Sequence, residues 1–171
     1  MKYQIREIKP DEYKLLNEFL YLSVFVPDGS PAPPHSITEH PLLQVYIRDF
    51  GHQKDDTGLV AVAEGTVVGM VWARIMDDFG HVDDETPSIA ISVRKEYRGM
   101  GIGTALLESM KDTLSKKGYE KTSLSVQKAN YAADMYRKAG FVTAGENEEE
   151  FIMVCFLRKD RGNIGNQDLS K

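Results

Sequence analysis

The sequence predicts an α/β domain of the mixed α+β kind, with one central mixed sheet and helices on both faces. Three observations predict it: strand-like runs recur along the chain, amphipathic helical segments separate them, and one pair of strands forms a hairpin. A length of 171 residues suits one domain, with 42% hydrophobic and 27% charged residues. We expect this domain over residues 1–160 and a flexible polar tail over residues 161–171.

The N-terminal third of the chain predicts a strand, a helix and a long proline-rich loop. Residues 2–9 alternate in polarity and predict the strand, after which Pro10 opens the amphipathic helix. The segment Pro27–Pro41 holds five of the seven prolines, which excludes a regular helix or a central strand there. Loops of this length are uncommon unless they bind a ligand or are disordered. We expect a short helix at about residues 42–50 to follow.

The middle of the chain predicts a hairpin, a further strand and a long helix. Residues 58–76 form the hairpin, with the turn at residues 64–66. Its second strand has apolar residues at both odd and even positions, which indicates a central strand covered on both faces. The strand at 88–93 leads to a helix over about 101–117, indicated by apolar residues at four-residue spacing. Gly118 is the expected end of that helix.

The C-terminal third predicts three strands and one helix. The strands lie at residues 121–126, 141–146 and 150–158, and the helix lies at 129–141 and ends at Gly140. The one cysteine, Cys155, lies in an apolar run and is expected to be a buried core residue. A single thiol cannot form a disulfide within the chain.

Charge and composition argue against several classes of partner. The net charge is −5 and no block of Lys and Arg stands out, so no nucleic-acid partner is expected. No signal peptide and no long apolar span is present, so we expect a cytoplasmic protein without a membrane partner. His35 and His40 do not make a metal site by spacing alone, and no metal is expected. The acidic balance slightly favours a cationic substrate.

The stretch YRGMGIG, residues 97–103, predicts an anion site. It follows a strand and precedes a helix, and the first amides of a helix lack partners inside the helix. Glycines remove the Cβ atoms that would hold a phosphate away from those amides. Arg98 adds a fixed positive charge suited to phosphate.

Two familiar phosphate-binding loops fit this stretch poorly. The P-loop needs a lysine after its glycines, and none follows here. The dinucleotide fingerprint needs G-x-G-x-x-G and an acidic residue at the end of the next strand. Here the glycines alternate, position 104 is a threonine, and Glu120 precedes its strand. An oxidoreductase that binds NAD is therefore weakly supported.

A third pattern fits well. Arg98, Gly101 and Gly103 form R-x-x-G-x-G, and about thirty residues later N-x-x-A-x-x-Y-x-x-x-G-F appears, beginning at Asn130. Together these motifs resemble the GNAT superfamily of acetyltransferases, with an order of elements that agrees over roughly residues 2–158. The resemblance implies a GNAT-like, mostly antiparallel sheet of about six or seven strands. It also implies that acetyl-CoA is the cosubstrate.

The resemblance assigns roles residue by residue. In this family the strand before the loop separates from its neighbour, and the main chain of Ile91 and Val93 would pair with the pantetheine arm of CoA. The Val93 amide would also polarise the thioester carbonyl. Asn130 would bond the pantetheine or its neighbourhood, and Tyr136 would contact the cofactor as well. The pyrophosphate would be held by Arg98, Gly99, Met100, Gly101, Ile102, Gly103 and Thr104.

The same resemblance implies an N-acetyltransferase in which an amine attacks acetyl-CoA directly in a ternary complex. Tyr136 would then donate a hydrogen bond to the leaving CoA thiolate and transfer its proton late. The alternative hypothesis is a CoA-binding regulatory module without turnover. The presence of Tyr136 and Asn130 argues for the enzyme.

The acceptor side has no motif of its own. A small-molecule or a peptide amine is expected, and the sequence leaves its identity and a homodimer open. Tyr21, Phe25 and Tyr46 flank the proline loop and could line an acceptor pocket, although core positions are favoured. The proton acceptor is left open between water and six side chains: Glu85, Asp83, Asp84, Glu39, His35 and His40.

Overall fold

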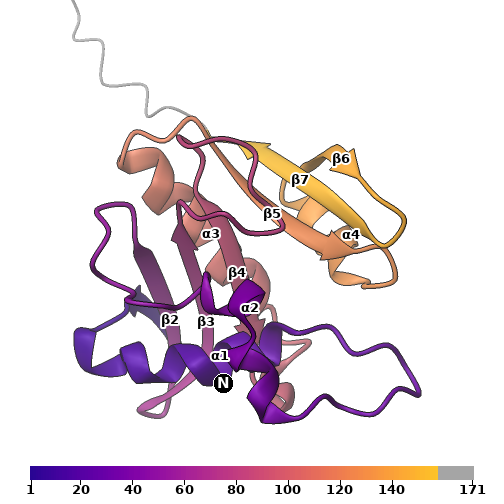
Figure 1. Ribbon diagram of the computed structural model, residues 1–171. Coiled ribbons are helices and arrows are strands. Elements are labelled where there is room, and N and C mark those ends of the chain that lie inside the picture. Colours follow the sequence, from indigo (N-terminus) through magenta and orange to yellow (C-terminus); the bar gives the residue numbers. More distant parts are fainter. Residues whose placement is uncertain (158–171) are drawn as a thin grey trace, which may run out of the picture.

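The computed structural model, described here over residues 1–157, contains one seven-stranded sheet in the order β1-β2-β3-β4-β5-β7-β6 (Figure 1). All neighbouring strands are antiparallel except β4 and β5, which are parallel. The prediction of a mixed, mostly antiparallel sheet is confirmed. The predicted tail at 161–171 lies outside the described residues. The strands are β1 Gln4–Glu7, β2 Thr57–Ala63, β3 Thr66–Arg74, β4 Ser88–Val93, β5 Lys121–Gln127, β6 Val142–Glu146 and β7 Glu150–Phe156.

Helices cover both faces of this sheet, as the sequence predicts (Figure 1). On one face, α1 and the segment around α2 pack on a core that includes Phe19, Met70 and Trp72. On the other face, α3 and α4 pack on a core that includes Leu106 and Phe141. The α-helices are α1 Leu16–Ser23, α2 Pro41–Gln44, α3 Ile102–Lys116 and α4 Ala132–Lys138, and the 3₁₀ turns are η1 Pro10–Leu15, η2 His35–Glu39 and η3 Lys95–Tyr97.

The N-terminal elements are shorter than predicted. β1 has four residues, Gln4–Glu7, and residues 2 and 3 of the predicted strand lie outside it. At its other end the Ile8 N–H still donates to the Gly58 carbonyl at 2.9 Å, and Pro10 has no N–H group to extend the pairing. The helix expected from Pro10 begins as the 3₁₀ turn η1. The helix expected at 42–50 is only α2, since the carbonyls of Val45 and Arg48 accept hydrogen bonds from the Arg74 side chain at 3.1 and 2.8 Å. A continuing helix would use those carbonyls itself.

The central hairpin and the long helix agree with their predictions. Glu64 and Gly65 both have positive φ, 49° and 76°, as a tight two-residue hairpin turn requires. All residues of β3 after Thr66 are buried, so this strand is covered on both faces. The predicted apolar stripe of α3 is buried, and Gly118, with φ 93°, follows its end. No helix among residues 1–157 is both long and apolar enough to cross a membrane.

Candidate functional site

The parallel strands β4 and β5 separate along their length (Figure 1). They are paired only at Ser88 and Ser123, where the Ser123 N–H donates to the Pro87 carbonyl at 3.1 Å. Beyond this point β4 keeps its pairing with β3 but is no longer paired with β5. The result is a wedge-shaped gap in the sheet, closed at Ser88 and open toward Val93. We call this gap the wedge.

The main chain of β4 presents unpaired groups to the wedge. The Arg94 N–H donates to the Val68 carbonyl of β3 at 2.8 Å. Main-chain groups of successive residues alternate in direction along a strand, so those of Ile91 and Val93 face the wedge. The Val93 carbonyl accepts a hydrogen bond from Arg98 Nε at 3.0 Å. The two strand residues predicted to act through their main chain therefore border the gap.

The glycine-rich loop forms an open cradle at the wide end of the wedge. Gly99 and Gly101 have φ of 76° and 81°, which side-chain-bearing residues rarely adopt, and a Cβ at either would meet nothing within 4 Å. Gly101 is the N-cap of α3, and no side chain of the described residues caps that helix. Its first amides are thus free to bind an anion. A Cβ at Gly103 would instead point inward, 3.6 Å from Met135 Sδ.

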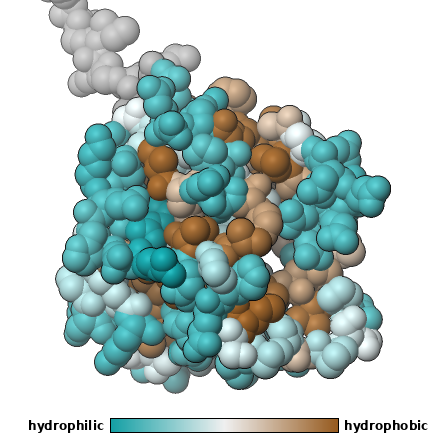
Figure 2. Space-filling view, viewed as in Figure 1, coloured by the Kyte–Doolittle hydropathy of each residue, from teal (hydrophilic) through white to brown (hydrophobic). Residues whose placement is uncertain are grey.

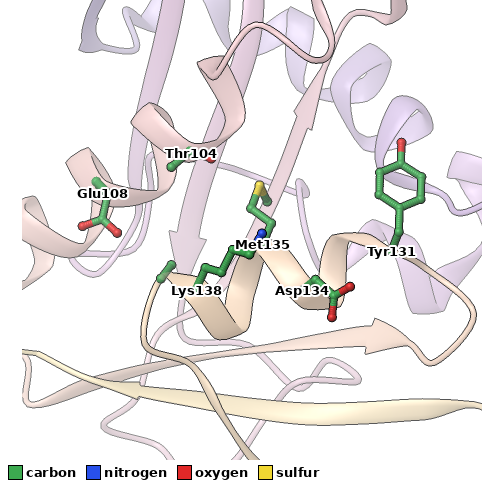
Figure 3. A pocket seen from close by; sticks show the side chains of 7 residues that line it. Thr104, Glu108, Tyr131, Asp134, Met135 and Lys138 are labelled. Carbon is green, nitrogen blue, oxygen red and sulfur yellow. The ribbon is translucent and has the colours of Figure 1, made fainter.

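The remaining predicted loop residues take different positions. The Met100 side chain is 53% exposed, whereas the Ile102 side chain is buried in the core under α3. Ile102 can therefore contact a ligand only through its main chain. Thr104, in the first turn of α3, lines an open cavity of about 430 Å³ between α3 and α4 (Figure 3). The same cavity is lined by Glu108, Tyr131, Asp134, Met135, Lys138 and Ala139.

Helix α4 places Tyr136 against the core and Asn130 at its start. The Tyr136 ring packs edge-on against Phe141, with centroids 5.9 Å apart. Burial raises the pKa of Tyr136 to about 12. Its hydroxyl makes no hydrogen bond to any of residues 1–157. The Asn130 side-chain oxygen accepts the Ala132 N–H at 2.9 Å, so Asn130 fixes the first turn of the helix.

The acidic residues proposed before β4 are exposed or already engaged. The Asp83 carboxylate accepts hydrogen bonds from Thr86 Oγ1 at 2.7 Å and from the Glu85 N–H at 2.9 Å, and it pairs with Lys121 at 3.0 Å. These contacts hold the pKa of Asp83 at about 2, which makes it a poor proton acceptor. The Asp84 side chain is 97% exposed, and Glu85 is exposed.

The candidates in the proline loop mainly order that loop. The His35 ring stacks on Tyr21 at 4.0 Å, and the Tyr21 hydroxyl donates to the Pro33 carbonyl at 2.6 Å. His40 Nδ1 accepts the Leu42 N–H at 3.1 Å and begins α2. Glu39 is exposed. Among residues 1–157, no group of three or more His, Cys, Asp or Glu side chains is arranged to hold a metal ion.

A polar group at the closed end of the wedge was not predicted. Asp78, from the loop after β3, accepts a hydrogen bond from Ser88 Oγ at 2.8 Å. The Tyr46 hydroxyl interacts with Asp78 and with Ser125 of β5. Burial raises the pKa of Asp78 and that of Tyr46. Nothing in the sequence distinguishes Asp78 from the other acids of its loop, and Tyr46 was expected to be core.

A split sheet with a glycine-rich cradle at its open end is the arrangement expected of an α/β acyltransferase fold. The chain belongs to the acetyltransferase (GNAT) family, whose model matches residues 19–141. This match includes the wedge, the cradle and α4.

Comparisons with individual proteins agree with this family. An N-alpha-acetyltransferase of Sulfurisphaera tokodaii is 36% identical over 57% of this chain and 68% of its own length. A mycothiol acetyltransferase of Propionibacterium freudenreichii is 32% identical over 51% of this chain, but the match spans only 28% of that relative. The crystal structure of PaiA N-acetyltransferase from Thermoplasma acidophilum in complex with coenzyme A matches 91% of this chain and 99% of that one. Its TM-score is 0.66 and its identity 21%, so it shows the fold.

Proposed function

We propose that this protein transfers an acetyl group from acetyl-CoA to an amine, by direct attack in a ternary complex. The observation that carries the proposal is the cradle at Gly99–Gly101, with its open Cβ positions and uncapped α3 amides, at the wide end of the wedge. Acetyl-CoA supplies an activated acyl group and a thiolate leaving group. Two findings support this choice of donor: the chain belongs to the GNAT family, and the structurally similar PaiA N-acetyltransferase was solved in complex with coenzyme A.

The chain's own groups would hold the donor in three places. Arg98 and the amides of residues 99–104 would bind the pyrophosphate, with the cavity between α3 and α4 next to it for the nucleotide (Figure 3). Val93 lies nearer to the cradle than Ile91, so its main chain would pair with the pantetheine arm as a substitute strand. The Ile91 amide, one step closer to the closed end, would then stabilise charge on the thioester oxygen in place of the Val93 amide. Asn130 would donate from its side-chain NH₂, while its side-chain oxygen accepts the Ala132 N–H.

Tyr136 would serve the leaving group. Its hydroxyl is free of hydrogen bonds to residues 1–157, and it lies on α4, the helix that borders the donor cavity. A donor at this position would stabilise the charge that develops on sulfur as the thioester breaks. Tyr136 and the Ile91 amide would then act on two different atoms of the breaking thioester, the sulfur and the carbonyl oxygen.

Alanine substitutions at two glycines with positive φ should separate strain from binding. We expect Gly101→Ala, with φ of 81°, to weaken CoA binding about tenfold, because its Cβ enters the cradle where the pyrophosphate would lie. Gly118→Ala is the matched control. It has φ of 93° and an equally open Cβ position, so it has similar backbone strain, but it lies past the other end of α3, and calorimetry should show unchanged CoA affinity. Equal weakening in both variants would contradict the proposed position of the pyrophosphate.

The proposed function is tested by following thiol release from acetyl-CoA over a panel of amines. The panel should include peptides with free N-termini, since a relative is named an N-alpha-acetyltransferase, together with alkyl polyamines and amino acids. Release that depends on the amine supports the proposal. CoA binding in calorimetry without turnover on any amine would favour a regulatory module. Binding of NAD without binding of CoA would favour a dinucleotide enzyme.

A further inference from the structure

The closed end of the wedge carries an arrangement that the proposed donor site does not use. Ser88, the first residue of β4, is the point at which this strand is paired with β5. Its hydroxyl donates to Asp78. Ser125 lies two residues past the paired Ser123 on β5 and interacts with Tyr46. Asp78 and Tyr46 together therefore bridge the two strands where they begin to separate.

This arrangement lies on the sheet face opposite to Tyr136. Ser92 of β4 donates to the Phe19 carbonyl of α1 at 2.7 Å, and Ser88 has the same parity along the strand. Side chains of equal parity share a face, so Asp78 is reached from the α1 and α2 side. Tyr136 packs in the core under α3. A donor bound in the wedge would thus have one polar group on each side.

Side chains of β3 fix the segment that carries Tyr46. The Trp72 Nε1–H donates to the Tyr46 carbonyl at 2.9 Å. The Arg74 side chain donates to the carbonyls of Val45 and Arg48 and forms a buried ion pair with Asp56. Tyr46 is therefore held in one position without a contribution from a ligand, as a preorganised site requires.

Asp78 lacks a cation. No Lys, Arg or His side chain of residues 1–157 forms an ion pair with it, and the titratable groups that face it are Tyr46 and, beyond this phenol, Glu150 of β7. Glu150 also lacks an ion pair within the described residues. Burying a carboxylate without a cation is unfavourable, so this position favours a positively charged ligand group. The ammonium form of an acceptor amine is such a group.

The face that carries α2 has apolar surface that an acceptor could contact. Figure 2, in the same view as Figure 1, shows apolar residues exposed in the middle of this face, between hydrophilic flanks. An aliphatic or peptide part could lie on these residues while the ammonium points inward.

We propose that Asp78, positioned by Ser88 and Tyr46 at the closed end of the wedge, binds the acceptor as an ammonium ion and accepts its first proton. This inference rests on the proposed acetyl transfer. The donor's pyrophosphate lies at the wide end, so its thioester end points toward Ser88 and Asp78. The neutral nitrogen then attacks the acyl carbon, the C–N bond forms and the C–S bond breaks. Of the two protons that the ammonium loses, one leaves to water through Asp78 and one ends on the CoA thiol.

The test compares Asp78→Asn with the wild type from pH 6 to pH 10, with the best acceptor of the panel. The variant can use only amine that arrives neutral. For a chain-terminal amine with pKa about 8, we expect kcat/KM to fall about tenfold at pH 7 and the deficit to vanish above the acceptor's pKa. The deficit should grow for acceptors of higher pKa. Asp77→Asn, the exposed neighbour, is the matched control and should match the wild type.

A second variant tests the same proton acceptor without removing it. The Tyr46 hydroxyl lowers the pKa of Asp78, so Tyr46→Phe should move the acidic limb of the kcat/KM profile to higher pH. Acetyl-CoA affinity should stay unchanged in both variants. Asp78→Asn within twofold of the wild type at pH 7, or a deficit that is constant with pH, would overturn the inference and leave acetyl transfer standing. A wild type that binds acetyl-CoA but acetylates no amine would overturn both.

Discussion

Replacing Arg74 with methionine is expected to lower the free energy of unfolding by about 3–5 kcal/mol. Its guanidinium forms two hydrogen bonds with the Asp56 carboxylate, at 3.0 and 3.1 Å, and the two side chains are 2% and 1% exposed. Removing the cation leaves the Asp56 carboxylate buried with only the main-chain N–H groups of Gly51 and Gln53 as hydrogen-bond donors among the described residues, at 2.8 and 3.3 Å. It also removes the donors to the carbonyls of Val45 and Arg48. Native domains are stable by only ~5–15 kcal/mol, so the effect is a large fraction of the total.

The Arg6–Glu12 pair provides the control for this experiment. It has the same bidentate chemistry, at 2.9 and 2.6 Å, but its side chains are 28% and 16% exposed. Arg6→Met should therefore cost about 1 kcal/mol or less in urea denaturation. A similar small cost for Arg74→Met would contradict the view that burial decides the effect. Arg74→Met should also loosen the segment that carries Tyr46. The variant's acetylation rate should therefore be reduced even at temperatures well below its melting temperature.

The sequence predicted the features that depend on local pattern. The four-residue spacing of apolar residues predicted α3, because a helix buries one stripe. Two strand-like runs on either side of Glu64–Gly65–Thr66 predicted the hairpin, and Glu64 and Gly65 have the positive φ that its turn requires. The R-x-x-G-x-G motif predicted the cradle, since its function depends on consecutive main-chain atoms. Several bounds differed. The helix expected from Pro10 begins as η1, α4 covers Ala132–Lys138 and not 129–141, and β1 and α2 are shorter than predicted. The end of α2 depends on a distant residue, because Arg74 donates to the carbonyls of the segment that follows it.

The cluster of polar residues at the closed end of the wedge could not be predicted from the sequence. Tyr46, Asp78, Ser88 and Ser125 come from four separate elements, and each has an ordinary local context. Their meeting depends on where β4 and β5 part, which is a property of the whole sheet. Of the acids that the sequence favoured, Asp83 lies in the same loop as Asp78 but forms structural contacts, and Asp84, Glu85 and Glu39 are exposed.

Tyr136→Phe is expected to lower kcat about 100-fold with little change in CoA affinity. The pKa of Tyr136 is raised to about 12 by burial, against about 8.5 for a model thiol. Complete proton transfer to the thiolate would thus be uphill by about 3.5 pKa units, or ~5 kcal/mol. The phenol therefore acts mainly as a hydrogen-bond donor to developing charge. Such a bond contributes about 1.5–3 kcal/mol, which corresponds to roughly 10- to 150-fold in rate.

The measurement must separate this role from packing, because Tyr136 also contacts Phe141 in the core. Phenylalanine keeps the ring, so unfolding and CoA binding should change little. Tyr3→Phe is the control: Tyr3 packs against the same core, beside β1 at the far edge of the sheet, and its loss of a hydroxyl should leave kcat unaltered. Unchanged kcat in Tyr136→Phe, with tight CoA binding, would remove Tyr136 from the mechanism. A loss near 10⁴-fold would instead mean that the proton is transferred in the transition state, and that bound substrates lower the phenol's pKa.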